Sequence, residues 1–390
     1  MEERENAKAA EAVVHAVAEG QRVSLGAPSL LALAGGKLLA AFDQTGPGVK
    51  ELGGNRGHEA KSNRWVQGRV MLSGDGGATW RLSATYPFRC ASLFRDGGDI
   101  YLAGEMEGAL VAMRSPDGGG SWSAPQQLTE RTGLRLSPTR PAAWNGAWWL
   151  PAQAERPDGG RGNLLLRAAQ GASLLNRKAW IAGPVAPPLA TFLAPAETMQ
   201  AAGIGLPCGR KPVAWGDLAA VEVPAGMQEW LPDGGLAVTG ATASGRCNWC
   251  AFLTAGADGS LSGAQVDGAP WRWLPLPGGH AKFSLFHDAP GKCFVAVGHR
   301  EAAAMRPETA GRMHRLGIWF SANLADWTYG GNPLPSGVEA GLRWAAASAV
   351  SGNDLCVAYR YAPPAPEGKR AAATQIRFVR VANFRQLRKA

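Results

Sequence analysis

The chain has 390 residues, 46% hydrophobic and 18% charged, which is enough to bury a large core. No uninterrupted apolar stretch reaches bilayer-spanning length, so we expect no contact with a membrane. Forty Lys and Arg against 31 Asp and Glu give a net charge of +9. These cations are scattered and form no dense basic run, so we expect anionic ligands but no nucleic acid.

The N-terminal segment, residues 1–20, is charged and rich in alanine. Val13, Val14 and Val17 follow helical spacing and Gly20 is a suitable stop, which predicts a helical extension before a domain spanning 21–390. The segment lacks the basic start, apolar centre and cleavage site of a secretory signal. The sequence as written therefore predicts a cytoplasmic protein, and a chain trimmed at this end would instead be secreted or periplasmic.

Apolar segments with turn signals between them recur six times along the rest of the chain, as expected for a protein with 52 Gly and 27 Pro. Each unit predicts a hairpin made of an inner strand and a second strand. The inner strands are expected near Pro28–Leu33, Arg89–Phe94, Arg140–Trp144, Met227–Trp230, Lys282–Phe286 and Arg343–Ala346. The second strands are expected at Leu38–Asp43, Ile100–Glu105, Trp148–Ala154, Leu236–Thr239, Phe294–His299 and Leu355–Tyr361. Residues 162–224 fit this pattern worst and are expected to hold long loops.

Two octets share the pattern Ser-x-Asp-x-Gly-x-Thr/Ser-Trp. They span 73–80 and 115–122 and lie 42 residues apart, which is the length of one four-stranded propeller blade. A degenerate copy occupies 321–327, and each copy follows an apolar strand. Asp and Ser can bond backbone N–H groups of a tight turn, Gly accepts positive φ, and Trp can pack the turn onto its hairpin. The octet is therefore expected to serve folding and not catalysis.

These octets resemble the Asp boxes of the sialidase (neuraminidase) superfamily. The resemblance implies an all-β fold, a six-bladed β-propeller of four-stranded antiparallel blades. It also implies a site over the central axis, at the face where inner strands begin and second strands end, with the octets at the opposite face. Members of the family bind a sugar carboxylate with three arginines and use an Asp as acid/base and a Tyr nucleophile paired with Glu.

Charged residues gather at the expected site face, although such residues are costly to bury. Arginine can hold a carboxylate through two hydrogen bonds, and a nearby Asp or Glu can exchange a proton with a glycosidic oxygen. The candidate catalytic residues are Asp43 as acid/base, Glu105 or Glu229 as its partner carboxylate, and Tyr361 as a weak substitute for the family nucleophile. The candidate substrate-binding residues are Arg89, Arg140, His280, Lys282, His299, Arg300, Arg343 and Arg360.

The sequence also departs from the family. Gly26-Ala27-Pro28 stands where an Arg-Ile-Pro motif is expected, and the last inner strand, beginning Arg343-Trp344, has no Tyr. Simpler roles exist as well, since Asp43 could cap a turn and Arg89 and Arg140 could form surface ion pairs. The leading hypothesis is a sialidase-like glycoside hydrolase acting on an acidic carbohydrate, and the alternative is a non-catalytic propeller that binds carbohydrate or protein.

The six cysteines do not predict a disulfide framework in a chain of this length. The Cys247-x-x-Cys250 pair lacks the second ligand pair that a zinc site needs, and no dinucleotide or phosphate-loop motif is present. We therefore expect free thiols, no bound metal and no cofactor. The oligomeric state is not indicated by the sequence.

Overall fold

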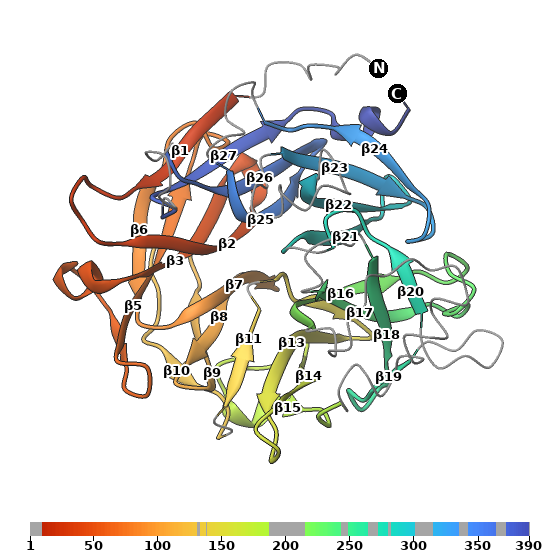
Figure 1. Cartoon of the computed structure of the whole chain (residues 1–390), viewed down its shortest axis with the longest axis horizontal. Coiled ribbons are helices and arrows are strands. Elements are labelled where there is room, and N and C mark those ends of the chain that lie inside the picture. Colours follow the sequence, from red (N-terminus) through yellow and green to blue (C-terminus); the bar gives the residue numbers. More distant parts are fainter. Residues whose placement is uncertain are drawn as a thin grey trace, which may run out of the picture.

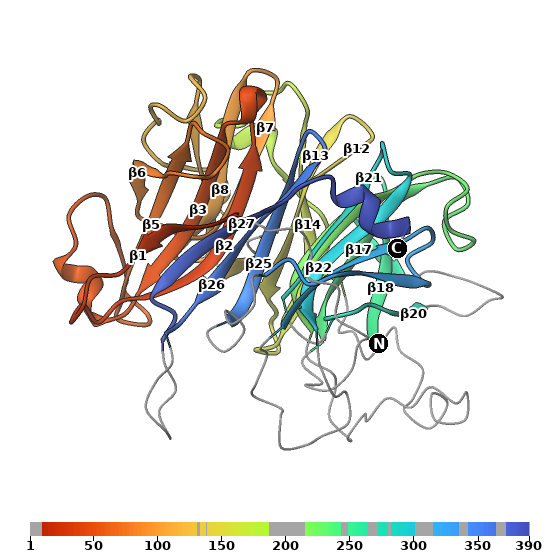
Figure 2. The ribbon, with the colours of Figure 1, turned by 90° about the horizontal axis from the view of Figure 1, so that it is seen from above.

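A computed structural model describes residues 10–130, 133–137, 139–186, 215–242, 249–263, 272–279, 282–300, 315–334, 342–363 and 372–389. Six antiparallel sheets surround one axis (Figure 1). Seen from the side, their strands run obliquely between two faces (Figure 2). The six-bladed all-β propeller expected from the repeats is confirmed. The described residues include no helix long and apolar enough to span a bilayer.

The first three sheets follow one another along the chain. The first contains β2 (Ser24–Ala32), β3 (Leu38–Thr45) and β5 (Arg64–Ser73), with β4 (Gly57–Glu59) and β6 (Arg81–Tyr86) both paired to β5. The second contains β7 (Arg89–Asp96), β8 (Asp99–Met106), β9 (Ala109–Ser115) and β10 (Gln126–Gln127). The third contains β11 (Leu134–Leu136), β12 (Ala142–Trp144), β13 (Ala147–Glu155), β14 (Arg161–Ala169) and β15 (Ile181–Ala182).

The last three sheets complete the ring. The fourth contains β16 (Trp215–Val223), β17 (Gly235–Thr242), β18 (Trp249–Ala255), β19 (Leu261–Gly263) and β20 (Arg272–Pro275). The fifth contains β21 (Ser284–Asp288), β22 (Cys293–Arg300), β23 (Arg315–Ser321) and β24 (Trp327–Gly331). The sixth contains β25 (Leu342–Ser351), β26 (Asp354–Tyr361), β27 (Gln375–Val381) and β1 (Ala10–Ala16). The described helices are short 3-10 turns: η1 (Ala34–Gly36), η2 (Pro47–Glu51), η3 (Arg177–Ala179) and η6 (Phe384–Lys389).

The predicted N-terminal helix is wrong. Residues 10–16 form β1, which pairs with β27 from the other end of the chain (Figure 1). Val14 is buried whereas its neighbour Val13 is exposed, which is the alternation of a strand. Pairing with β1 covers the edge of β27 that would otherwise be open, and Glu11 pairs with Arg377 at 3.0 Å across this junction. Strand β1 therefore closes the ring and is part of the propeller.

All six predicted second strands are present, and the errors lie in the fourth sheet. Its inner strand is β16, and Met227–Trp230 lies in the connection between β16 and β17. Residues 162–224 therefore include β14, β15 and β16 as well as loops, while 187–214 lie outside the described residues. The turn signal at Asp233 was correct, but the strand before it lies further upstream.

The octets form hydrogen-bonded turns after the third strand of their sheets, as predicted. Asp75 accepts from the Thr79 backbone N–H at 2.9 Å and the Thr79 hydroxyl at 2.6 Å, and Asp117 accepts from Ser121 in the same way. Ser73, which opens the first octet, pairs with Leu38 at the start of β3. The turn therefore lies at the opposite end of the sheet from Asp43.

The octet tryptophans join neighbouring sheets, which the sequence did not predict. Trp80 packs edge-on against Phe378 of β27, with ring centroids 5.5 Å apart. Trp122 donates from Nε1 to Ser83 of the first sheet at 3.0 Å, and Trp327 donates to Pro275 O of the fourth sheet at 2.7 Å. Each tryptophan thus fixes its own turn to the preceding sheet.

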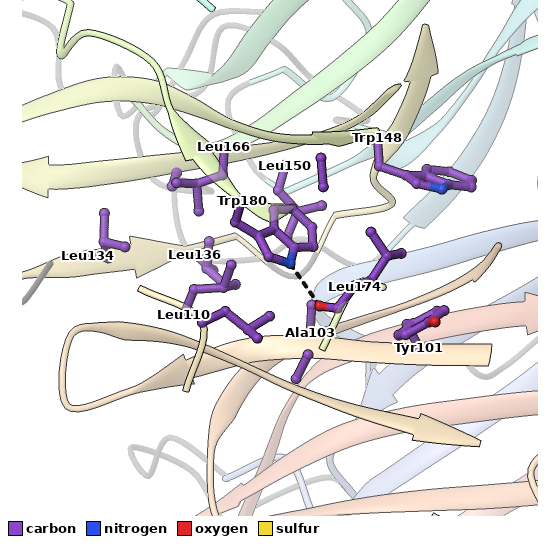
Figure 3. Close-up of a cluster of buried hydrophobic side chains, with 14 of the residues drawn as sticks. Tyr101, Ala103, Leu110, Leu134, Leu136, Trp148, Leu150, Leu166, Leu174 and Trp180 are labelled. Atoms are coloured by element: carbon purple, nitrogen blue, oxygen red, sulfur yellow. Dashed lines mark hydrogen bonds between the residues drawn. The ribbon is translucent and has the colours of Figure 1, made fainter. Parts of the chain in front are cut away.

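The core consists of apolar clusters between adjacent sheets. Between the second and third sheets, aliphatic side chains surround Trp180, whose Nε1 donates to Leu174 O at 2.9 Å (Figure 3). Trp148 belongs to the same cluster and packs against Phe94, with ring centroids 5.1 Å apart. Around the axis, hydroxyls connect the inner strands and the segment before β12 by five hydrogen bonds: Leu93 N to Ser29 Oγ, Ser92 Oγ to Thr139 O, Leu218 N to Ser137 Oγ, Thr139 Oγ1 to Leu218 O, and one between the Ser284 and Ser348 hydroxyls. These bonds hold in place the strand ends that form the site.

Candidate active site

Four inner strands enter their sheets through the same irregularity. The registers shift between Gly26 and Ser29, Arg89 and Ser92, Gly216 and Ala219, and Arg343 and Ala346. In three of these bulges the extra residue has a positive φ: +48° at Ala27, +52° at Cys90 and +46° at Asp217. Bulges of this kind redirect side chains beside functional sites, and a positive φ in a residue other than glycine marks local strain.

The bulges face charged residues on the second strands. Gly26 pairs with Asp43, Arg89 with Glu105 and Arg343 with Arg360. Asp43, Glu105 and Arg360 therefore hold equivalent positions at the ends of β3, β8 and β26. The sequence analysis selected residues at the ends of strands, and this rule identified residues at equivalent positions in three different sheets.

Asp43 lies at the interface of the first and second sheets and is 5% exposed. Its Oδ2 accepts a hydrogen bond from the Cys90 backbone N–H at 2.7 Å, whereas Oδ1 is buried and has no hydrogen-bond partner among the described residues. Burial raises the pKa of Asp43 to about 7, against the opposing effects of the Cys90 hydrogen bond and the charges of Lys282 and Arg89. A carboxyl group with this pKa can both give and take a proton near neutral pH.

Tyr86 stands beside Asp43 and was missed by sequence analysis. Its ring crosses Gly68, where a Cβ atom would lie 1.8 Å from the ring, so only glycine is accommodated there. The Tyr86 hydroxyl donates to Phe42 O at 3.2 Å. Burial, followed by the charge of Asp43, raises the pKa of Tyr86 well above its ordinary value. The Tyr86 hydroxyl therefore stays protonated near neutral pH.

Arg89 is held between two carboxylates. Its Nε lies 2.5 Å from Glu59 Oε1, and its Nη2 lies 2.9 Å from Glu105 Oε1. The other Glu105 oxygen accepts from the Leu136 backbone N–H at 3.3 Å, which connects the second sheet to the third. Burial raises the pKa of Glu105, and the charge of Arg89 acts against this rise. Arg89 is thus balanced by protein groups, while an acidic pocket of about 110 Å³ lies beside it, lined in part by Glu59, Glu105 and Glu107.

Lys282 supplies a buried positive charge from the fifth sheet. It is 6% exposed and makes no hydrogen bond or ion pair within the described parts of the chain. Burial lowers the pKa of Lys282, and the negative charges of Asp217 and Asp43 oppose that change. Asp217, at the bulge of β16, is exposed and was also missed by the sequence. The charges of two carboxylates, Asp43 in the first sheet and Asp217 in the fourth sheet, therefore act on Lys282.

The remaining predicted site residues lie in different parts of the propeller. Arg140 precedes β12 and lines a small cavity on the axis. Tyr361 ends β26, and the Arg377 guanidinium lies 3.5 Å from its ring centroid. His299 is buried in β22, and Arg360 in β26 is half-buried. His280 lies outside the described residues, as do the side chains of Arg300 and Arg343.

Glu229 was placed wrongly. The prediction put it at the start of the fourth inner strand, but it is an exposed turn residue between β16 and β17. Because Val223 pairs with Gly235, this turn lies at the end of the sheet opposite Asp217. Of the two predicted partner carboxylates, only Glu105 lies at the face of Asp43. The described residues contain no cluster of three His, Cys, Asp or Glu side chains arranged for a metal ion.

Comparison with solved structures places this geometry on a known scaffold. The chain is similar to a Dyadobacter fermentans protein of unknown function (TM-score 0.56, 14% identity, covering 95% of this chain and 98% of that one). It is also similar to the Hadza microbial sialidase Hz136 (0.56, 14%, covering 92% and 66%) and to Penicillium chrysogenum alpha-L-arabinanase (0.53, 13%, covering 97% and 99%). The chain has the sialidase-like propeller fold. No protein-family model matches this propeller, and no curated protein matches it in sequence.

Proposed function

We propose that this propeller is a glycoside hydrolase that acts on an acidic sugar, with Asp43 as the acid/base. The observation that carries the proposal is the state of Asp43: one oxygen is fixed by the Cys90 N–H at 2.7 Å, and the other is buried without a partner. A pKa of about 7 leaves both protonation states available at neutral pH. Sialidases and an arabinanase with the same fold support carbohydrate as the substrate class.

The charges around Asp43 support an anionic substrate. Lys282 is buried and has no hydrogen-bond partner among the described residues, so a carboxylate on the sugar would stabilise its charge. Glu105 is the partner carboxylate, and its ion pair with Arg89 and its bond from Leu136 N–H set its orientation. Tyr361 is not assigned a nucleophilic role, because no carboxylate among the described residues contacts its hydroxyl.

Hydrolysis of fluorogenic glycosides of acidic sugars tests the proposal. Asp43→Asn preserves the size of the side chain and an acceptor for Cys90 N–H, but it cannot exchange the proton. We expect kcat/KM to fall by about 10²–10⁴-fold. The matched control is Asp233→Asn in the exposed β16–β17 turn, which should retain full activity.

The same experiment separates the enzyme from a binding propeller. A binding propeller would take up the acidic glycoside with unchanged affinity in Asp43→Asn and would release no free sugar in either form. Turnover by the parent protein that persists in Asp43→Asn would also overturn the proposed role of Asp43.

A further inference from the structure

A small cavity lies on the propeller axis, beneath the site. It has about 30 Å³ of space for water-sized groups, which is room for one or two such groups. Five of the six sheets contribute to its walls, through the inner strands β2, β16, β21 and β25 and the segment before β12. Its polar lining residues are Ser29, Thr139, Arg140, Ser284 and Ser348. No carboxylate is present among the described residues that line it.

The lining hydroxyls leave donors available. Ser29 Oγ accepts from Leu93 N–H at 3.0 Å, so its own proton is not used in that bond. Ser284 and Ser348 share one hydrogen bond of 2.7 Å, which leaves one of their two protons. Thr139 uses its proton on Leu218 O at 2.6 Å. Two hydroxyl protons therefore remain for an acceptor in the cavity.

Arg140 adds a positive charge that protein groups do not balance. Within the described residues it makes no ion pair or hydrogen bond, in contrast to Arg89, which contacts both Glu59 and Glu105. Arg140 lines the hollow and is also exposed to solvent. Lys282 lies two residues before Ser284 and adds a second cation to this region. Two cations without a protein counter-charge beside a hollow lined by hydroxyl groups attract an anion.

We propose that the axial cavity binds one monoatomic anion of halide size, held by Arg140 and the free hydroxyl protons of Ser29 and of the Ser284–Ser348 pair. Each of these side chains lines the cavity and offers a hydrogen-bond donor or a positive charge, and the volume suits one small ion. Such an ion would connect the first, third, fifth and sixth sheets across the axis. This inference does not depend on the proposed hydrolytic activity.

Bromide is the direct probe, because it replaces chloride and scatters anomalously. Crystals of the full chain grown or soaked in bromide should show one anomalous peak in the axial cavity, next to the Arg140 guanidinium. Bromide only at surface positions, or a neutral water in the cavity in the presence of bromide, would overturn the proposal.

Thermal unfolding at constant ionic strength gives a second, solution measurement. Replacing gluconate by about 100 mM chloride should raise the melting temperature by about 3 °C if the site binds with millimolar affinity. Arg140→Gln should abolish this rise, and Ser29→Ala, which removes one of the two free hydroxyl protons, should weaken chloride binding about 3–10-fold. Arg95→Gln, which replaces an exposed arginine near the end of β7, is the matched control and should retain the full response.

Two outcomes of the solution experiment contradict the proposal. An equal chloride response in Arg140→Gln and the parent protein would show nonspecific stabilisation. Chloride that competes with an acidic glycoside but does not stabilise the free protein would assign Arg140 to substrate binding instead.

Discussion

Two aspartates at opposite ends of the first sheet differ in what holds them. Asp75, in the turn after β5, is exposed to solvent, yet it accepts hydrogen bonds from Thr79 and Ser73 that lower its pKa to about 2. Asp43, at the end of β3, is buried, accepts one hydrogen bond from Cys90, and has its pKa raised to about 7. The number of hydrogen bonds and the degree of hydration thus decide whether an aspartate stays ionised or can exchange a proton.

The same division applies to the two faces of the propeller. At the octet face, carboxylates and tryptophans are saturated with partners and join one sheet to the next. At the site face, the buried Asp43 Oδ1 and Lys282 lack hydrogen-bond partners among the described residues, and strained residues such as Cys90 and Asp217 shape the strand entries. The residues that stabilise the fold and the residues that form the candidate site therefore lie at opposite faces of the propeller, so that one set can change without the other.

Stability as a function of pH should separate the two aspartates most strongly. The folded-state pKa of Asp43 lies above its unfolded value of 3.8, so ionisation destabilises the protein as pH rises from about 4 to about 7, and the cost is constant above that. Asp43→Asn should remove this dependence. We expect the variant to match the parent protein near pH 4 and to exceed its free energy of unfolding by up to about 4 kcal/mol near pH 8. Parallel denaturant-unfolding profiles for the two proteins would contradict the assignment.

Replacing Lys282 tests whether the unpartnered charges of the site face serve a ligand. Lys282→Met keeps the length of the side chain and removes its charge, so KM for an acidic glycoside should rise about 10–100-fold. A neutral glycoside, if it is a substrate, should be unaffected. Stability should not fall, because a buried cation without a partner is costly. Lys37→Met, at an exposed position, is the control, and equal losses on acidic and neutral substrates would refute a charge-specific role.

The sequence predicted the residues whose position follows from strand order. Asp43, Glu105 and Lys282 lie at the ends of apolar segments, and the hairpin pattern was enough to place them at one face. Tyr86 could not be found this way, since it reaches Asp43 across Gly68 from the outer strand β6. Asp217 was missed and Glu229 misplaced for a single reason. The inner strand β16 has no clear turn signal before it, whereas Asp233-Gly-Gly235 drew the prediction downstream.

Substituting the aspartate of an octet should affect stability and activity in the opposite way to substituting Asp43. The folded-state pKa of Asp75 lies below its unfolded value, so its stabilising effect is present above about pH 4 and is lost as the pH falls toward 2. Asp75→Asn should lower the melting temperature by a few degrees at neutral pH and leave activity unchanged. The difference from the parent protein should shrink toward pH 2. Asp117→Asn in the second octet should behave alike, and a loss of activity in either variant would contradict the separation of the two faces.

The smallest effect is expected for Glu59, which shares Arg89 with Glu105. Glu59→Gln removes one of two carboxylates from Arg89 but leaves the 2.9 Å pair with Glu105 in place. Because Arg89 and Glu59 keep partial contact with solvent, we expect a loss of about 1 kcal/mol or less in the free energy of unfolding and a change in kcat/KM within a few-fold. Glu105→Gln should cost more, since Glu105 is nearly buried and also accepts from Leu136 N–H. Equal losses in the two variants would show that Arg89 depends on both carboxylates together, so that the two ion pairs act as one unit.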